Sequence, residues 1–176
     1  MNGKILKTKP IHKARVFDLV REEVVLPNGM QMELDIIRHP GASAIVPMKD
    51  PQTLLMLVQY RHAIGESIWE VPAGTLNDGE DPLECAKREL EEETGFTATT
   101  WEKLGEITPL PAYSDERIHI YLARDLHPSQ QNLDPDEIVQ VREVPFDNAL
   151  HMITTGQIKD GKSISSIFLA KVYLGR

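Results

Sequence analysis

Carboxylate side chains are concentrated in residues 74–96 of this 176-residue chain. Between positions 77 and 94, eight acidic residues stand against two basic ones, Lys87 and Arg88. This local excess supplies most of the formal net charge of −8. Because carboxylate oxygens are the ligands that hard divalent cations prefer, the segment is the first candidate for a functional site.

The same segment predicts a helix. Asp81 suits the N-cap position with Glu84 as its capping-box partner, because both can bond to free amides of the first turn. Pro82 suits the first helical position, and Gly95 suits the left-handed residue that ends a helix. Side chains spaced three and four residues apart would form its buried face, namely Leu83, Ala86, Leu90 and Thr94.

Three glutamates, Glu89, Glu92 and Glu93, share another face of this helix. Like charges at such spacing cost roughly 0.2–0.5 kcal/mol per pair, and carboxylates in the last turn oppose the helix dipole. Arg88 can pair with Glu92, but no basic side chain is placed to neutralise Glu89 and Glu93. Two explanations follow: a solvated acidic face, or a site for a divalent ion such as Mg²⁺.

The flanking residues favour the ion site, because the segment resembles the Nudix box of the Nudix hydrolase superfamily. The resemblance covers nine positions at fixed spacing: Gly74, Glu80, Arg88, Glu89, Leu90, Glu92, Glu93, Gly95 and Phe96. It implies an α/β fold, the Nudix α/β/α sandwich with a mixed sheet, over residues 42–176. It also implies metal-dependent hydrolysis of a phosphoanhydride bond.

The resemblance assigns roles to the residues of the box. Mg²⁺, with Mn²⁺ as a substitute, would be held by Glu89, Glu92 and Glu93 and by the backbone carbonyl of Ala73. Arg88 would support Glu92 or contact the substrate. Glu80 would be structural. The catalytic set is then Glu92, Glu93 and Arg88, together with a general base from outside the box.

Glu116 is the candidate for that base, because metal-bound carboxylates are poor proton acceptors. It lies in residues 111–117, a loop that looks like the catalytic loop of ADP-ribose pyrophosphatases. Asp115 competes for the role. Without the resemblance, both residues would be interpreted as exposed acids of a turn.

Substrate-binding residues are expected outside the box. Gln59, Arg61 and Glu70 lie in segments that are similar to those of the ADP-ribose or nucleotide-sugar branch. By this resemblance Arg61 would clamp phosphate or ribose, as its planar donors allow, and Glu70 would contact the terminal sugar or a metal-bound water. A surface ion pair is the alternative role of Arg61.

The loop at residues 111–117 contains markers that resemble those of two different substrate groups. Pro111, sixteen residues beyond Gly95, resembles the marker of the ADP-ribose group, whereas Tyr113 resembles one of diadenosine polyphosphate hydrolases. Residues 30–38 offer no aromatic side chain to stack on adenine, and Phe17 is a candidate replacement.

Other segments supply the elements that must position these groups. Asn28-Gly29 between two β-type stretches predicts a hairpin over residues 16–38. Strands are predicted at 42–48, 53–60, 68–74, 97–106, 117–125 and 138–142, and residues 127–135 are irregular. Helices are predicted at 146–154 and along an apolar stripe of Ile164, Ile167, Phe168 and Val172.

The first 41 residues form a separate arm in this interpretation. An isolated hairpin is marginally stable, so we expect the arm to pack on a second copy of the chain and to make a homodimer. Residues 1–15 are basic and are predicted to be a solvated tail.

Bulk properties narrow the class further. The acidic charge argues against nucleic-acid binding, and no apolar run is long enough to cross a membrane or to act as a signal peptide. The single cysteine, Cys85, agrees with a reducing compartment, so a cytoplasmic protein is expected.

The predicted function is Mg²⁺-dependent hydrolysis of ADP-ribose or a related nucleoside diphosphate sugar to a nucleoside monophosphate and a sugar phosphate. Two alternatives remain. One is a hydrolase of dinucleoside polyphosphates or damaged nucleotides. The other, from a different class, is a domain that senses ADP-ribose without cleaving it.

Overall fold

The computed structural model describes residues 2–176, which divide into two compact units. The first contains residues 2–41 together with the loop 108–117, and the second contains residues 42–107 and 118–176. The loop, which the sequence division placed with residues 42–176, therefore groups with the N-terminal segment.

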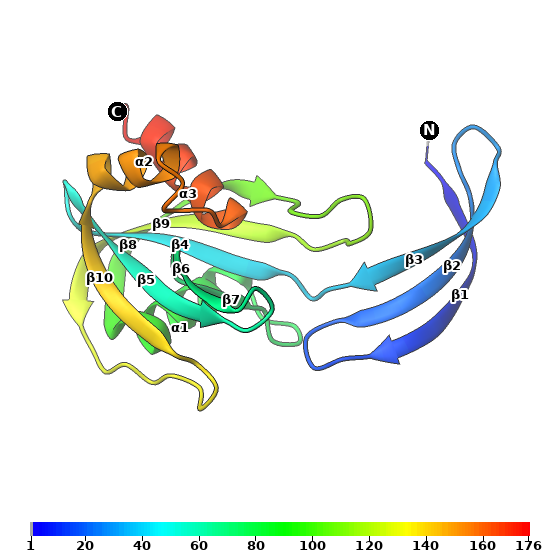
Figure 1. The fold of residues 1–176 in the computed structure, drawn as a ribbon, viewed down its shortest axis with the longest axis horizontal. Coiled ribbons are helices and arrows are strands. Elements are labelled where there is room, and N and C mark those ends of the chain that lie inside the picture. The colour runs from blue at the N-terminus through cyan, green and yellow to red at the C-terminus, as the bar shows by residue number, and fades with distance from the viewer. Residues whose placement is uncertain (1) are drawn as a thin grey trace. The chain divides into compact units, whose positions relative to one another are not determined.

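The first unit is a three-stranded antiparallel sheet in the order β1-β2-β3 (Figure 1). Its strands are β1 (Lys4–Lys13), β2 (Asp18–Val25) and β3 (Gln31–Arg38). The predicted hairpin is confirmed as β2 and β3. Gly29 has a φ of 84°, and Asn28 Oδ1 accepts a hydrogen bond from the Met30 amide at 3.0 Å. Gly29 supplies the left-handed residue of the turn that joins these strands, and the Asn28 side chain stabilises that turn.

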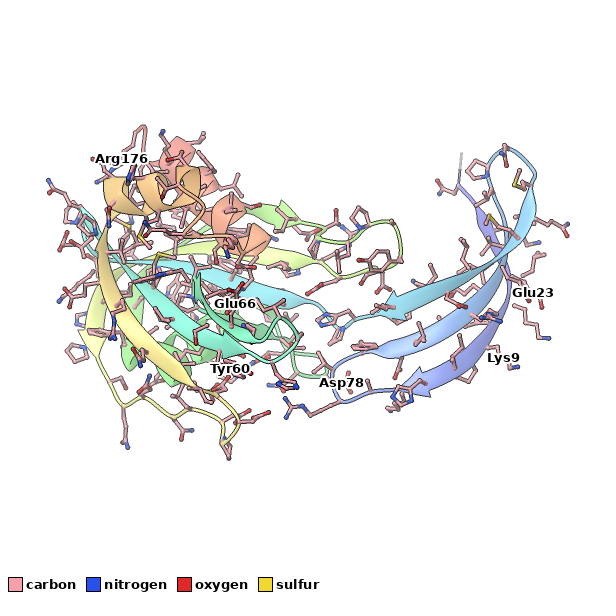
Figure 2. The ribbon with its side chains drawn as sticks, in the orientation of Figure 1. Lys9, Glu23, Tyr60, Glu66, Asp78 and Arg176 are labelled. Carbon is pink, nitrogen blue, oxygen red and sulfur yellow. The ribbon has the colours of Figure 1, made fainter. Side chains whose placement is uncertain are left out.

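The predicted solvated tail is wrong, because residues 4–13 form strand β1 on the outer edge of β2. Every side chain of β1 is exposed, as Lys9 illustrates in Figure 2. Because no face of β1 is buried, its sequence does not need to alternate between apolar and polar residues. Its extended conformation is stabilised by pairing with β2.

The second unit is built on a seven-stranded mixed sheet. The main path runs β10-β5-β4-β9-β8, with β6 paired to β5 and β7 paired to β4. Only β4 and β9 run parallel among these described pairs. The strands are β4 (Ala42–Asp50), β5 (Thr53–Arg61), β6 (Glu66–Glu70), β7 (Ala73–Thr75), β8 (Phe96–Ile107), β9 (Ile118–Pro128) and β10 (Val139–Pro145).

Helices cover both faces of this sheet, which confirms the α/β/α sandwich (Figure 1). Helix α1 (Pro82–Thr94) lies on one face, and α2 (Phe146–Thr154) and α3 (Gly161–Tyr173) lie on the other. Successive side chains of β4 alternate between the two cores. Ile45 packs with Ala86 and Leu90 of α1, whereas Ala44 and Val46 belong to the core beneath α2 and α3.

Both ends of α1 are satisfied by hydrogen bonds. Asp81 accepts from the Leu83 amide at 2.8 Å, and Gly95, with a φ of 72°, donates to Glu91 O at 2.9 Å. Residues 129–132 then bond to the last carbonyls: Ser129 N to Gly95 O at 2.7 Å, Gln131 Nε2 to Glu93 O at 2.7 Å and Asn132 N to Glu92 O at 2.9 Å. The segment after β9 is thereby tied to the end of α1.

The predicted buried stripe of α3 is partly wrong. Ile167 is buried, but Phe168 is exposed and Val172 is 78% exposed. Small side chains instead share the buried face with Ile167, namely Ser163, Ser166 and Ala170. Small residues allow a helix to approach a sheet closely. The hydroxyl groups of Ser163 and Ser166 keep these residues out of a pattern defined by apolar side chains.

None of the helices within residues 2–176 is long and apolar enough to span a membrane.

Candidate active site

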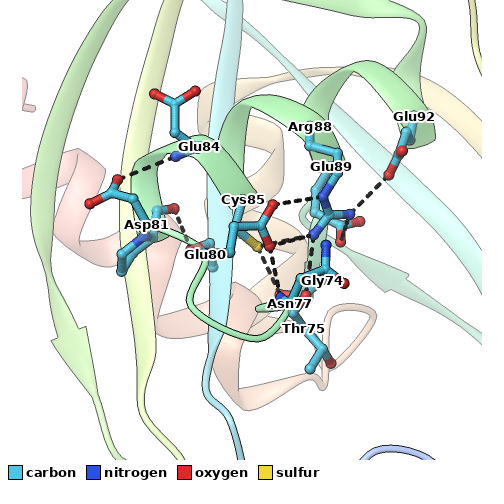
Figure 3. Close-up of polar contacts among 12 residues, drawn as sticks. Gly74, Thr75, Asn77, Glu80, Asp81, Glu84, Cys85, Arg88, Glu89 and Glu92 are labelled. Atoms are coloured by element: carbon cyan, nitrogen blue, oxygen red, sulfur yellow. Dashed lines mark hydrogen bonds and ion pairs between the residues drawn. The ribbon is translucent and has the colours of Figure 1, made fainter.

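Arg88 is the centre of a hydrogen-bonded cluster on α1 (Figure 3). Its Nε and Nη2 donate to the two carboxylate oxygens of Glu80 at 2.9 and 3.0 Å. Nη1 donates to Glu89 at 2.6 Å and to Glu92 at 2.9 Å, and Nη2 also donates to Thr75 O at 3.2 Å. One guanidinium therefore joins the loop before α1 to two of the predicted metal ligands.

Among the contacts of Arg88, the pair with Glu80 has the largest effect on the pKa of the guanidinium. The hydrogen bond from Arg88 lowers the pKa of Glu80 to about 2, and the bond to Glu80 raises the pKa of Arg88. A bidentate pair of this kind orients both side chains. The structural role expected for Glu80 remains a prediction, and this geometry supports it.

The local pairing on α1 differs from the sequence expectation at Arg88. Arg88 contacts Glu89 as well as Glu92, although no base was expected to reach Glu89. Lys87 pairs with Glu84 at 2.7 Å, whereas Glu91 accepts from Ser129 Oγ at 2.5 Å. Ser129 lies in the segment after β9, so residue spacing along the helix cannot predict its contact with Glu91.

Glu89 and Glu93 are buried, at 8% and 2% exposure. Burial raises the pKa of both carboxyl groups, and the charge of Glu89 raises the pKa of Glu93 further. Glu93 Oε2 accepts a hydrogen bond from the Ala73 amide at 2.8 Å. The predicted ligands Ala73 and Glu93 are thus in direct contact, and two carboxyl groups share a region from which water is largely excluded.

Gly74 makes room for the Glu89 carboxylate. A Cβ atom at Gly74 would lie 1.8 Å from Glu89 Oε1, which is shorter than any non-bonded contact. Gly74 belongs to β7, the three-residue strand paired with β4. Any side chain at position 74 would therefore displace the Glu89 carboxylate from its present place.

A hard divalent ion fits these donors. Burial without a full counter-charge raises the pKa of Glu89 and Glu93, and a bound cation would stabilise their ionised forms. Glu92 is less buried and adjoins them. Arg88 holds Glu89 and Glu92, and within residues 2–176 no three acidic, histidine or cysteine side chains already form an ion-binding group. Ion binding would therefore require these carboxylates to converge.

Glu137 is a residue that the sequence reasoning missed. Its charge raises the pKa of both Glu89 and Glu93, so it lies near enough to act on them from the segment between β9 and β10. Glu137 accepts from the Asp134 amide at 2.9 Å, and its own amide donates to Asp134 O at 2.9 Å. The segment shows no periodicity, and its acidic run at residues 134–137 was the available signal.

The predicted substrate-binding residues lie together where β5 pairs with β6. Arg61 Nε donates to Glu70 Oε2 at 2.9 Å, and Glu70 is buried while the Arg61 side chain is 40% exposed. Gln59, two residues before Arg61, is 4% exposed, and its Oε1 has no hydrogen-bond partner among residues 2–176. A buried acceptor of this kind calls for a donor from a ligand or from water.

Glu116 and Asp115 belong to the first unit. Asp115 accepts from the His39 amide and from Arg38 Nη1, both at 2.9 Å. Although burial opposes it, these bonds lower the pKa of Asp115. Glu116 Oε1 lies 3.9 Å from His39 Nδ1. Asp115 is therefore occupied by structural bonds, which make it a poor proton acceptor.

Comparison with known proteins identifies the family. A model described as the NUDIX domain matches residues 38–166. The chain belongs to the Nudix family. The predicted membership is confirmed, and the protein is a Nudix hydrolase.

This Nudix hydrolase is similar to proteins of known activity along almost its whole length. A methanol dehydrogenase activator from Bacillus methanolicus is 40% identical over 166 residues, which cover 93% of this chain and 90% of that protein. An ADP-ribose pyrophosphatase from Bacillus subtilis (strain 168) is 37% identical over 169 residues, covering 95% and 91%. A crystal structure of an ADP compounds hydrolase shares the fold, with a TM-score of 0.86, 22% identity and coverage of 99% and 95%.

Replacing Glu93 with glutamine should stabilise the metal-free protein at neutral pH and not in acid. The raised pKa of Glu93 means that its contribution to stability is fully present below the unfolded value of 4.5 and is lost as the pH rises through the folded pKa. We expect Glu93→Gln to raise the free energy of unfolding at neutral pH, because it removes a buried charge, and to lose this advantage in acid.

Urea unfolding with a chelator, from acid to neutral pH, measures this difference. Glu84→Gln on the exposed side of α1 is the matched control. A gain in stability for Glu93→Gln that stays constant across this pH range would contradict the raised pKa of Glu93.

Proposed function

We propose that this Nudix hydrolase cleaves the diphosphate bond of ADP-ribose or a related nucleoside diphosphate sugar, with Mg²⁺ as its ion and Mn²⁺ as a substitute. The observation that carries the proposal is the buried pair Glu89 and Glu93 beside Gly74, a set of hard oxygen donors without a full counter-charge. Nudix hydrolases generally use divalent ions, and a related protein is named as an ADP-ribose pyrophosphatase.

The side chains divide the work of such a reaction. Glu89, Glu92 and Glu93, with the Ala73 carbonyl, would hold the ion, which supplies positive charge to the diphosphate and acidifies a bound water. The bidentate contact with Glu80 fixes the guanidinium of Arg88. The fixed guanidinium then holds Glu89 and Glu92 beside each other. The role of Arg88 is thus to orient ligands.

Two glutamates are candidates for the general base. Glu116 was expected from the sequence, and its carboxylate is only 20% exposed. Glu137 is the second candidate, because its charge acts on Glu89 and Glu93 and it is not one of the proposed ligands. A base must be able to take a proton from the attacking water, and both carboxylates can do so.

Arg61 is proposed to bind phosphate or ribose, with Glu70 and Gln59 beside it. Glu70 contacts Nε and Nη2 of Arg61, and the guanidinium remains partly exposed, so it can also meet an anionic substrate. The unpartnered Oε1 of Gln59 would accept from a substrate hydroxyl or from water. These residues, unlike the metal ligands, would select among nucleotide sugars.

The function is tested by measuring phosphate released, after treatment with a phosphatase, from a panel of nucleoside diphosphate compounds with Mg²⁺. The panel contains ADP-ribose, ADP-glucose, GDP-mannose, NADH and diadenosine polyphosphates. We expect turnover of a nucleotide sugar, and Glu93→Gln should reduce it by at least about 100-fold, whereas Glu84→Gln should leave it unchanged.

Preference for diadenosine polyphosphates would support the second hydrolase function instead. A protein that binds ADP-ribose tightly without turnover would support the sensor, although the family membership argues for an enzyme. Wild-type turnover by Glu93→Gln would contradict the metal assignment.

The choice of base is tested with Glu116→Gln and Glu137→Gln. Loss of the base should lower kcat by about 10²–10⁴-fold and remove the acidic limb of the pH–rate profile, while Mg²⁺ affinity changes little. Only one variant should behave in this way. Asp115→Asn is the control, and unchanged kinetics in both glutamine variants would exclude both candidates.

We also propose that the first unit forms a homodimer contact. Its strands and the connections between them carry exposed apolar side chains that a single copy leaves uncovered, namely Ile5, Leu6, Ile11, Val16, Phe17, Met30 and Met32. Two copies that pack through β1–β3 would bury them. A cytoplasmic location stays a prediction.

Light scattering tests the dimer. The full chain should have the mass of a dimer, and a chain lacking residues 1–40 should be a monomer or an aggregate. Because truncation also exposes residues 108–117, the double variant Leu6→Glu with Met32→Glu provides a milder test and should be monomeric. A dimer of unchanged affinity in either case would contradict this interface.

A further inference from the structure

Glu70 is shared between two cations, one on each carboxylate oxygen. Oε2 lies 2.9 Å from Arg61 Nε and 2.7 Å from Nη2, and Oε1 accepts from Lys162 Nζ at 2.8 Å. The Glu70 carboxylate is 3% exposed, so it depends on these contacts in place of water. It cannot rotate toward either partner without losing the other. Lys162 therefore fixes the torsion of Glu70 and, through it, the orientation of Arg61.

Lys162 is itself fixed at the start of α3. Its Nζ also lies 2.8 Å from Asp160 Oδ2, and its side chain is only 14% exposed. Asp160 is the N-cap of α3 and accepts from the Ser163 amide at 3.0 Å and from Ser163 Oγ at 2.5 Å. The ammonium group is thus held from two sides, unlike that of a solvated surface lysine.

The same helix end also holds the turn that leads into the box. Ser163 Oγ accepts from the Val71 amide at 2.8 Å, and two residues later Ala73 donates to Glu93. Burial raises the pKa of Glu93, and the charge of Lys162 acts in the opposite direction. Lys162 therefore lies close enough to influence Glu93 as well as Glu70.

We propose that Lys162 is a positioning residue for substrate binding, which acts by holding Glu70 so that Arg61 presents its guanidinium to the substrate. This inference rests on the proposed function of Arg61. Asp160 keeps Lys162 in place, and Ser163 fixes the turn independently through Val71. Loss of the lysine charge alone should therefore disturb Arg61 without releasing the turn beside the metal ligands.

Kinetics of Lys162→Met, which keeps the length of the side chain and removes its charge, test the proposal. For the nucleotide sugar that the wild type hydrolyses, KM should rise by about tenfold or more, because a buried charged contact to a binding residue is lost. The value of kcat should stay within about threefold, because Glu93 and Ala73 keep their contact. Lys162→Arg should recover most of the loss in KM.

Two further variants serve as controls. Lys159→Met removes an exposed lysine three residues away, which lies 3.6 Å from Glu66, and it should have no effect on KM. If Lys162→Met folds poorly because Glu70 is left unpaired, the double variant Glu70→Gln with Lys162→Met removes that buried charge. Its KM should equal that of Glu70→Gln alone, since both changes break one linkage.

A measurement on the metal-free protein separates this proposal from the proposed function. The Arg61 Nε–H, followed by nitrogen-15 NMR, should exchange with solvent at least about tenfold faster in Lys162→Met and at an unchanged rate in Lys159→Met. Wild-type protein that hydrolyses none of the panel would overturn the proposed function, and this exchange rate would still decide the contact. Unchanged exchange together with unchanged KM, or a loss confined to kcat, would overturn the role of Lys162.

Discussion

The burial of two carboxyl groups close to each other is the constraint around which the residues of the candidate site are arranged. Glu89 and Glu93 lie four residues apart on α1, and burial raises the pKa of both. An unpaired buried charge is costly, so such groups persist where a protein binds a cation or needs a perturbed carboxyl. The close approach of Gly74 and the hydrogen bond from Ala73 bring backbone to these side chains in place of water.

Two fixed cations flank this acidic region and come from different elements. Arg88, on α1 itself, is held by Glu80 and contacts Glu89 and Glu92. Lys162, at the start of α3, is held by Asp160 and contacts Glu70. Each cation is bound by a carboxylate of its own, and within residues 2–176 neither forms an ion pair with Glu93. The arrangement orders the acidic side chains without cancelling their charge, as a site for a divalent ion requires.

Residues outside the box surround the acidic side chains that are proposed to bind the metal ion. The family match accounts for the box and for hydrolysis, whereas the relatives carry different names over nearly the same length. The contacts of Arg61, Glu70 and Gln59 involve β5, β6 and α3, three elements that the box does not include. If these residues bind the substrate as proposed, substrate preference can change while α1 and β7 stay the same.

The sequence by itself determined helix α1, its caps at Asp81 and Gly95, the hairpin turn at Asn28-Gly29 and the family. These features depend on spacing along the chain and on local backbone preferences, which a single sequence displays directly. It also marked Glu89 and Glu93 as lacking a neighbouring base, although Arg88 proved to contact Glu89. Helix spacing did not report that contact because the loop before α1, through Thr75 and Glu80, sets the direction of the guanidinium.

Only the tertiary structure decided which distant residues meet these groups. Strand β1 forms because β2 offers it an edge, and the buried face of α3 uses Ser163 and Ser166 because small side chains permit close packing. Glu137 and Lys162 lie far from the box in sequence, and neither belongs to a periodic or spaced motif. They reach the acidic region because residues 129–132 bond to the end of α1 and because α3 begins beside β6. Contacts between distant segments are set by packing of the whole fold, which no local pattern encodes.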